Sequence, residues 1–132
     1  MTIAAETTFE AYLHAIRDLP LLEPAHEQQL FEQIRAGQEA GAQLQSDLPL
    51  SASARAHLEQ LVARGTQARE TVIAAHLRLV IRIARQYTSR GVALLDLIQE
   101  GNLGLLHAID HFDPAVGVRF ATYASWWVRH AV

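Results

Sequence analysis

The sequence contains no cysteine and no lysine, and each absence narrows the chemistry open to the protein. Without cysteine the chain forms no disulfide bond and offers no thiolate ligand to a metal ion. All eleven cationic residues are therefore arginine, whose flat guanidinium group stacks on rings and donates paired hydrogen bonds, as the lysine ammonium group does not. A biased genomic base composition also produces a preference for arginine over lysine. The absence of lysine therefore has either a functional or a neutral explanation.

Long apolar runs, an export signal and nucleotide-binding loops are missing as well. No apolar run approaches the roughly 18 residues of a transmembrane helix, and the N-terminus has neither a basic start nor an apolar signal core. There is no glycine-rich phosphate loop with its lysine and no Gly-x-Ser-x-Gly nucleophile turn. We therefore expect a cytoplasmic protein that is not an enzyme, holds no cofactor and has no membrane partner.

Negative charge is concentrated in the first half of the chain. The net charge of -3 argues against a protein that holds duplex DNA mainly by neutralising its phosphates. Residues 1–66 carry a net charge of -5 and residues 67–132 one of +2, so the cations gather in the second half.

Apolar residues recur at helical spacing and strand-like alternation is missing, which predicts an all-α, compact bundle of five or six helices. A chain of 132 residues with 50% hydrophobic residues is long enough for one domain with a continuous core. A capping box at Thr7 and Glu10 predicts a first helix that runs to about Asp18.

Glycines indicate where the next helices end. The apolar stripe of the second helix stops before Gly37, which we expect to terminate it. After a connection with little apolar signal, Ser51 or Ser53 is expected to begin a short helix that ends at Gly65. A long helix should then run to Tyr87.

This long helix is apolar on most sides. The exception is a stripe formed by Arg78, Arg82 and Arg85, at intervals of four and three, which is either a solvated edge or a functional one. His76 lies among apolar residues and is expected to be a partly buried core histidine.

The segment from Leu94 to His111 predicts a helix with two different faces. Because glycine inside a helix costs about 1 kcal/mol relative to alanine, Gly101 and Gly104 predict the close approach of a second helix. The opposite sector is polar and surrounds one apolar side chain; it consists of Asp96, Gln99, Glu100 and His107 around Leu103. Such a leucine is either an anchor for a partner or an ordinary exposed residue.

The segment from His111 to Val132 holds five of the nine aromatic residues of the chain. On a helical wheel, the side that should face the core consists of Phe120, Tyr123, Ala124, Trp127 and Ala131. Trp126 falls on the opposite side, among Arg119, Thr122, Arg129 and His130. A flat ring among cations and hydrogen-bonding groups is suited to stacked bases and phosphates.

A metal site is the other chemistry that this segment suggests. His107 and His111 are four residues apart, with Asp110 and Asp113 nearby, which places two imidazoles on one helix face. A zinc site needs at least three protein ligands, so we expect surface histidines and no metal.

Three segments carry a family resemblance: HLRLVIRIARQYTSRG (76–91), LLDLIQEGNLGLLHAIDHFD (94–113) and FATYASWWVRHAV (120–132). They closely resemble consecutive parts of the second region of bacterial housekeeping-type sigma factors, the promoter-recognition subunits of RNA polymerase. The resemblance covers about sixty residues almost continuously, and DLIQEGNLGL with TYASWWVR is a highly specific pair. Residues 9–37 resemble the preceding conserved region more loosely.

The resemblance implies a single sigma domain over residues 1–132. It divides the chain into an N-terminal helical hairpin (1–37), a variable connection (38–70) and a core (71–132) that holds the polymerase-binding and promoter-melting helices. The family's aromatic helix continues beyond the position of Val132, so we expect a truncated fragment, monomeric when free.

In the family, the polar face of the LIQEGN helix docks on a coiled coil of the clamp-forming largest subunit of the polymerase core. The resemblance therefore implies that this face binds the polymerase. The residues expected to do so are Asp96, Gln99, Glu100, Asn102 and Leu103.

The family's aromatic helix faces the promoter minus-ten element and opens it, and a non-template adenine is flipped into a pocket. The residues that correspond to this pocket are Phe112, Thr122 and Tyr123. Trp126 and Trp127 correspond to paired tryptophans at the upstream edge of the melted region. The expected DNA-binding set is completed by His76, Arg119, Phe120, Arg129 and His130.

Several positions depart from the family pattern. The family usually has tyrosine at Pro114, basic residues near Ala115 and Val116, and an aromatic residue at Val118. Other departures are His14 for Arg, His76 for Asn, Ala121 for Ser and His130 for Gln. The loop before the aromatic helix thereby loses cations and rings, and we expect weaker melting or an altered preferred sequence.

An all-helical protein-interaction module without sequence-specific DNA binding is the alternative. Its useful surface would be the polar face around Leu103, and its aromatic residues would belong to the core. In that case Trp126 should be buried.

Overall fold

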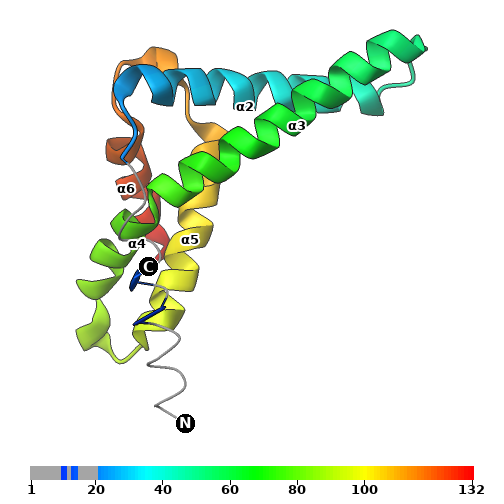
Figure 1. The fold of residues 1–132 in the computed structure, drawn as a ribbon. Coiled ribbons are helices and arrows are strands. Elements are labelled where there is room, and N and C mark those ends of the chain that lie inside the picture. Colours follow the sequence, from blue (N-terminus) through cyan, green and yellow to red (C-terminus); the bar gives the residue numbers. More distant parts are fainter. Residues whose placement is uncertain (1–9, 12, 15–20) are drawn as a thin grey trace. The chain divides into compact units, whose positions relative to one another are not determined.

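The computed structural model describes residues 10, 11, 13, 14 and 21–132. Its helices are α2 (Pro24–Gln45), α3 (Ala52–Ala75), α4 (Leu77–Arg85), α5 (Leu94–His111) and α6 (Phe120–Ala131), with 3-10 turns at Thr88–Arg90 and Pro114–Val116 (Figure 1). The described residues contain no strand, and the expected all-α fold is confirmed. The ends of the first expected helix, near Thr7 and Asp18, lie outside the described residues.

The chain divides into two compact units, and each is described by itself. The hairpin unit is Leu22–Val72, which contains α2 and most of α3, and the C-terminal unit contains Ile73–Val132. Among the described residues, no helix combines the length and the apolar character needed to cross a membrane.

In the hairpin unit, α2 and α3 approach each other closely at two glycines. A Cβ atom on Gly37 would lie 3.0 Å from the Cα of Gly65, and one on Gly65 would lie 3.0 Å from the Cα of Gly37. Both glycines are inside helices, so the helix ends expected at these positions are wrong. Glycine either terminates a helix or allows the backbones of two helices to come into contact. The periodicity of a single helix does not distinguish between these two roles.

The connection between α2 and α3 is short. α2 continues to Gln45, and the Ser46 hydroxyl donates to the Gln43 carbonyl oxygen at 2.7 Å. The Ser51 hydroxyl oxygen accepts from the Ala54 N–H at 3.0 Å. Of the two expected starts of the next helix, Ser51 is therefore the N-terminal cap.

A break at His76 separates α3 from α4, so the expectation of one long helix through Tyr87 is wrong. His76 has φ -116° and ψ 8°, and its backbone N–H donates to the Ile73 carbonyl oxygen at 3.0 Å. No proline or glycine marks the break in the sequence. The His76 side chain is 7% exposed and its ring meets the Phe120 ring edge-on, with centroids 4.8 Å apart, as expected of a core histidine.

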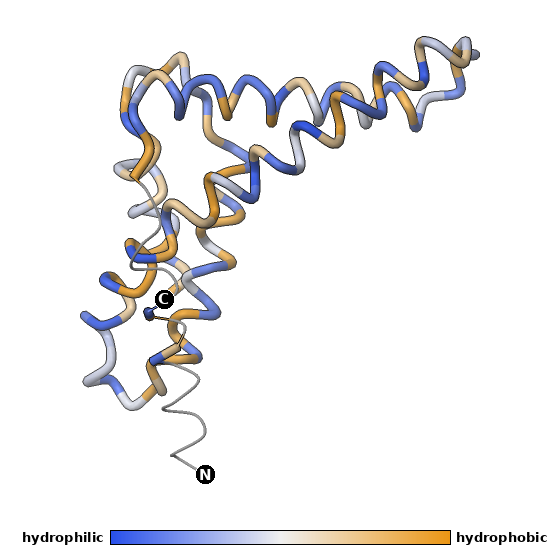
Figure 2. Tube along the Cα trace, in the orientation of Figure 1, coloured by the Kyte–Doolittle hydropathy of each residue, from blue (hydrophilic) through white to orange (hydrophobic). Residues whose placement is uncertain are grey.

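The C-terminal unit is built around α5, which packs against both α4 and α6. Hydrophobic stretches run along α4 and α5 (Figure 2), and fully buried side chains from the three helices are Val80, Ile83, Leu105, Ile109, Phe120 and Val128. A Cβ atom on Gly104 would lie 2.7 Å from the Trp127 carbonyl oxygen, and one on Gly101 would lie 2.8 Å from Cγ1 of Val80. The close approach predicted at these two glycines is confirmed, and α6 crosses α5 at Gly104.

Candidate nucleic-acid interface

Helix α6 has a buried side and an exposed side. Phe120, Ala124 and Val128 are buried, whereas Trp126 is 54% exposed. The side chains predicted to surround Trp126 are exposed as well; they are Arg119, Thr122, Arg129 and His130. The predicted orientation of α6 is confirmed, and the alternative that places Trp126 in the core is wrong on this point.

A cluster of rings lies behind the exposed side. The Phe112 centroid is 5.2 Å from that of Phe120 and 5.4 Å from that of Tyr123, and the Tyr123 hydroxyl donates to the His111 carbonyl oxygen at 3.3 Å. Phe112 is 5% exposed and Phe120 is fully buried. In this structure Phe120 and His76 therefore pack inside the unit, and neither presents a surface for the DNA contact expected of it.

Five further rings follow one another along α5 and α6, and we call them the ring series: His111, His107, Trp127, Trp126 and His130. Their neighbouring centroids are 4.1, 3.9, 4.9 and 3.8 Å apart in that order. The two indole planes are nearly perpendicular, at 85°, and His130 stacks on Trp126 at 28°. The exposed Trp126 ring thus lies between Trp127 and His130 near one end of a continuous series of rings.

Sequence reasoning missed the contact of His107 and His111 with this surface. Among the described residues, no group of three or more histidine, cysteine or acidic side chains is placed to hold a metal ion. The available signal was the position of His107 one helical turn after Gly104, where α6 crosses α5. The position of His107 predicts a contact with Trp127 only when α6 is known to be the helix that crosses α5 at Gly104.

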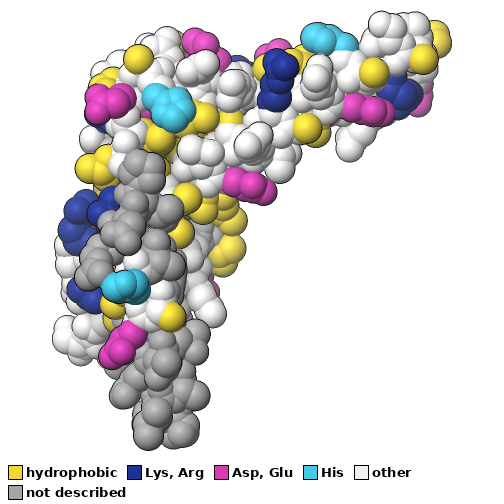
Figure 3. Space-filling view, viewed as in Figure 1, with side chains coloured by type: hydrophobic (Ala, Val, Ile, Leu, Met, Phe, Trp, Pro, Cys, Tyr) yellow, Lys and Arg dark blue, Asp and Glu magenta, His cyan; other side chains and the backbone are white. Residues whose placement is uncertain are grey.

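Arginines border the ring series. Arg129 donates through Nη1 to the Gln86 side-chain oxygen at 2.7 Å, which connects α6 to the end of α4. On α4 itself, Arg82 and Arg85 are exposed, and cationic side chains gather over this helix in Figure 3. The guanidinium group of Arg90 lies 4.9 Å from the centre of the Tyr87 ring. Two of the three arginines of the predicted basic edge, Arg82 and Arg85, are therefore exposed, and the residue after Arg85, Gln86, contacts Arg129 of α6.

The polar face of α5 carries the five residues expected to bind a protein partner. Asp96, Gln99 and Glu100 are exposed, Asn102 is half-buried, and Leu103 is 59% exposed. The side-chain oxygen of Asn102 is buried and, within the described part of the chain, has no hydrogen-bond partner. An acidic face with a protruding leucine is suited to a basic protein surface that has an apolar recess.

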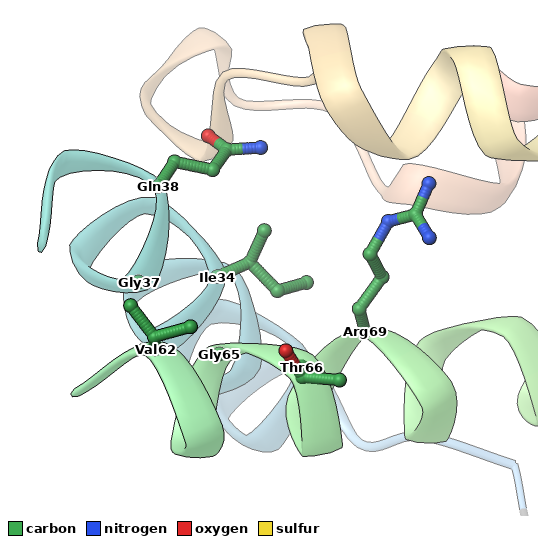
Figure 4. A pocket seen from close by; sticks show the side chains of 7 residues that line it. All are labelled: Ile34, Gly37, Gln38, Val62, Gly65, Thr66 and Arg69. Atoms are coloured by element: carbon green, nitrogen blue, oxygen red, sulfur yellow. The ribbon is translucent and has the colours of Figure 1, made fainter. Parts of the chain in front are cut away.

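The hairpin unit has a cavity of about 140 Å³ beside the two crossing glycines. It is lined by Ile34, Gly37, Gln38, Val62, Gly65, Thr66 and Arg69, and Figure 4 shows Ile34 pointing from α2 into the space above α3. None of the predicted site residues lines it.

An all-α unit with an exposed tryptophan and stacked rings offers a surface suited to nucleic-acid bases. Comparison with known proteins makes this assignment specific. Residues 72–132 match the family model of sigma-70 region 2. These residues belong to the sigma-70 region 2 family.

Curated relatives extend the similarity beyond that region. The chain is 46% identical over 123 residues, or 92% of its length, to the RNA polymerase principal sigma factor HrdD of Streptomyces griseus. Proteins of the same name from Streptomyces viridifaciens and Streptomyces coelicolor are 43% identical over 122 residues. The chain spans 37% of the length of each of these relatives.

Proposed function

We propose that this chain acts as the part of a bacterial RNA polymerase sigma factor that docks on the polymerase and recognises and opens the promoter minus-ten element. The observation that carries the proposal is the exposed Trp126, held in a surface of rings and arginines on a unit of the sigma-70 region 2 family. The relatives named as principal sigma factors support it. The role is not enzymatic, and its place is the bacterial cytoplasm, on the nucleoid through the polymerase.

Capture of single-stranded bases is the proposed chemistry of α6. Extruding a base from a duplex costs a few kcal/mol, and stacking on an aromatic side chain returns about 1–3 kcal/mol per base. One or two captured bases of the non-template strand therefore balance the local cost without ATP. Trp126 offers one of these stacking surfaces at the duplex edge.

The second stacking surface lies at Tyr123. Its ring is half-buried, Phe112 closes the space behind it at 5.4 Å, and the Thr122 hydroxyl is exposed beside it. A flipped adenine that enters here stacks on Tyr123 and finds a hydrogen-bonding group at the rim. Phe112 then acts as the wall of the pocket and not as a surface feature.

Docking on the polymerase is assigned to the polar face of α5. Asp96 and Glu100 provide negative charge for a basic coiled coil of the clamp, and Leu103 provides the apolar anchor. Burying the exposed part of this leucine contributes about 1–2 kcal/mol. The net charge of -3 makes free DNA binding weak, so attachment to the polymerase supplies the remaining affinity.

The loop between α5 and α6 is the weakest part of this interface. Val116 and Val118 are 67% and 46% exposed, at positions where the family usually places basic or aromatic residues. Neither side chain attracts phosphate or stacks on a base. We therefore propose a lower melting efficiency, or a shifted sequence preference, relative to family members with a basic loop.

The proposal is tested by oligonucleotide binding with and without polymerase core. A non-template strand with the family's minus-ten consensus should bind better than a scrambled strand, and Trp126→Ala and Tyr123→Ala should each remove the preference. His57→Ala, an exposed position in the hairpin unit, is the matched control. Equal binding of both strands by the unaltered chain would refute sequence-specific recognition, and failure to bind the polymerase core would refute docking.

A further inference from the structure

Each of the two tryptophans in the ring series has an imidazole ring against it. The His107 centroid lies 3.9 Å from that of Trp127, with the planes at 51°. The His130 centroid lies 3.8 Å from that of Trp126, with the planes at 28°. These distances are shorter than the 4.9 Å between the two indoles themselves, so among the described residues the imidazoles are the nearest ring neighbours of both tryptophans.

Backbone hydrogen bonds fix two of the three histidine rings. Nδ1 of His111 lies within hydrogen-bond distance of the His107 carbonyl oxygen, at 2.9 Å, and Nδ1 of His130 lies 3.2 Å from the Trp126 carbonyl oxygen. A carbonyl oxygen only accepts, so Nδ1 carries the proton in both rings. Each ring is thereby tied to its own helix one turn back, which leaves it little rotational freedom.

The third ring, His107, is held between its neighbours. His111 stacks on it with centroids 4.1 Å apart and planes at 22°, while Trp127 lies at 3.9 Å. Trp127 in turn meets Trp126 edge-on at 85° and Tyr123 at 65°. Rotation of the Trp127 ring would therefore require a shift of His107, Trp126 or Tyr123.

We propose that His107, supported by His111, and His130 are positioning residues that set the perpendicular arrangement of Trp127 and Trp126 before DNA arrives. The inference rests on the proposed function, since the positioned rings are those assigned to base stacking. Rings that are already ordered lose less conformational entropy when a base binds. One face of Trp126 is occupied by His130, so a base stacks on the other face.

The placement of the rings is tested without DNA, by comparing three variants with the unaltered chain. A ring stacked on an indole shifts the NMR signals of the indole protons through its ring current. His107→Ala should therefore move the signals of Trp127, and His130→Ala should move those of Trp126. His57→Ala should move neither. Unchanged indole signals in His107→Ala and His130→Ala would overturn the proposal, whatever the protein does with DNA.

The consequence for binding is measured on the same variants with the minus-ten strand and polymerase core. His107→Ala should weaken binding by about twofold to tenfold, and His107→Phe, which keeps a ring, should restore most of it. The slope of binding against salt concentration should stay the same, because positioning releases no counterion.

Two results would overturn the positioning role while leaving the proposed function intact. One is full binding by His107→Ala when the unaltered chain still prefers the consensus strand. The other is a salt slope lower by about one, which would mean that the imidazole contacts a phosphate directly. If the unaltered chain binds the consensus and the scrambled strand equally, the proposed function is refuted instead. The NMR signals of the two tryptophans would still show whether the histidine rings lie against them.

Discussion

Replacing Gly104 with alanine adds a methyl group where no space exists. Its carbon would lie 2.7 Å from the Trp127 carbonyl oxygen and 2.9 Å from Cβ of Ala131. The first contact is with backbone, so no side-chain rotation relieves it and α6 has to move away from α5. Overpacking of this kind costs about 1–3 kcal/mol, partly offset by about 1 kcal/mol of helix propensity gained on replacing glycine.

Because a backbone atom lies at 2.7 Å, the overpacking cost should fall in the upper part of its range, about 2–3 kcal/mol. After the offset, we expect Gly104→Ala to lower the free energy of unfolding by about 1–2 kcal/mol. Gly41→Ala is the matched control, because its nearest neighbour would be Cγ2 of Val62 at 3.9 Å, an ordinary contact. This control should be neutral or gain about 1 kcal/mol of stability. Both are measured by urea denaturation followed by far-UV circular dichroism. Equal stability of Gly104→Ala and the unaltered chain, or a larger loss in Gly41→Ala, would refute the reasoning.

Three further outcomes are expected. Ser51→Ala removes the acceptor of the Ala54 N–H and should cost about 0.5–2 kcal/mol in urea denaturation; Ser53→Ala is its control, and an equal effect of both would contradict the cap. Leu103→Asp, at a 59% exposed position, should weaken binding to polymerase core about tenfold or more in a pull-down titration without changing stability; unchanged affinity would exclude Leu103 as the anchor. Phe120→Ala should cost about 3–5 kcal/mol of stability because the side chain is fully buried; a loss of DNA binding without a loss of stability would restore Phe120 as a DNA contact.

Helical periodicity predicts which side of a helix faces water, and it did so correctly here. The exposure of Trp126 and the burial of Phe120 and Ala124 follow from positions on a wheel, since 3.6 residues per turn fix the faces once a helix is assumed. The other residues expected on the core side, Tyr123, Trp127 and Ala131, are half-buried, and Val128, which was not among them, is buried. The close approach at Gly101 and Gly104 was predicted for a related reason. Glycine in the middle of an apolar face has few explanations other than a neighbouring backbone.

The same reasoning failed at Gly37 and Gly65 because their surroundings are mixed. Both lie near polar, alanine-rich sequence that also fits a loop, and only the contact between them shows that each replaces a side chain at a crossing. The break at His76 carries no sequence signal of its own. It results from the packing of the C-terminal unit, where the His76 ring is buried against Phe120.

Contacts between helices were the least predictable part of the site. The ring series joins α5 to α6, and its members were predicted separately, as surface histidines on α5 and as part of a DNA-binding face on α6. A wheel drawn for one helix contains no information about rings on another. The stacking of His107 on Trp127 therefore appears only when both helices are placed.

The short connection between α2 and α3 has a practical consequence for engineering. Residues 46–51 join two helices that the crossing at Gly37 and Gly65 already holds together, and Leu48 is 74% exposed. An exposed turn between elements that are fixed elsewhere tolerates inserted sequence. A fluorescent domain or affinity tag introduced between Asp47 and Leu48 should therefore leave α2 and α3 folded and paired, which provides a labelling position within the hairpin unit.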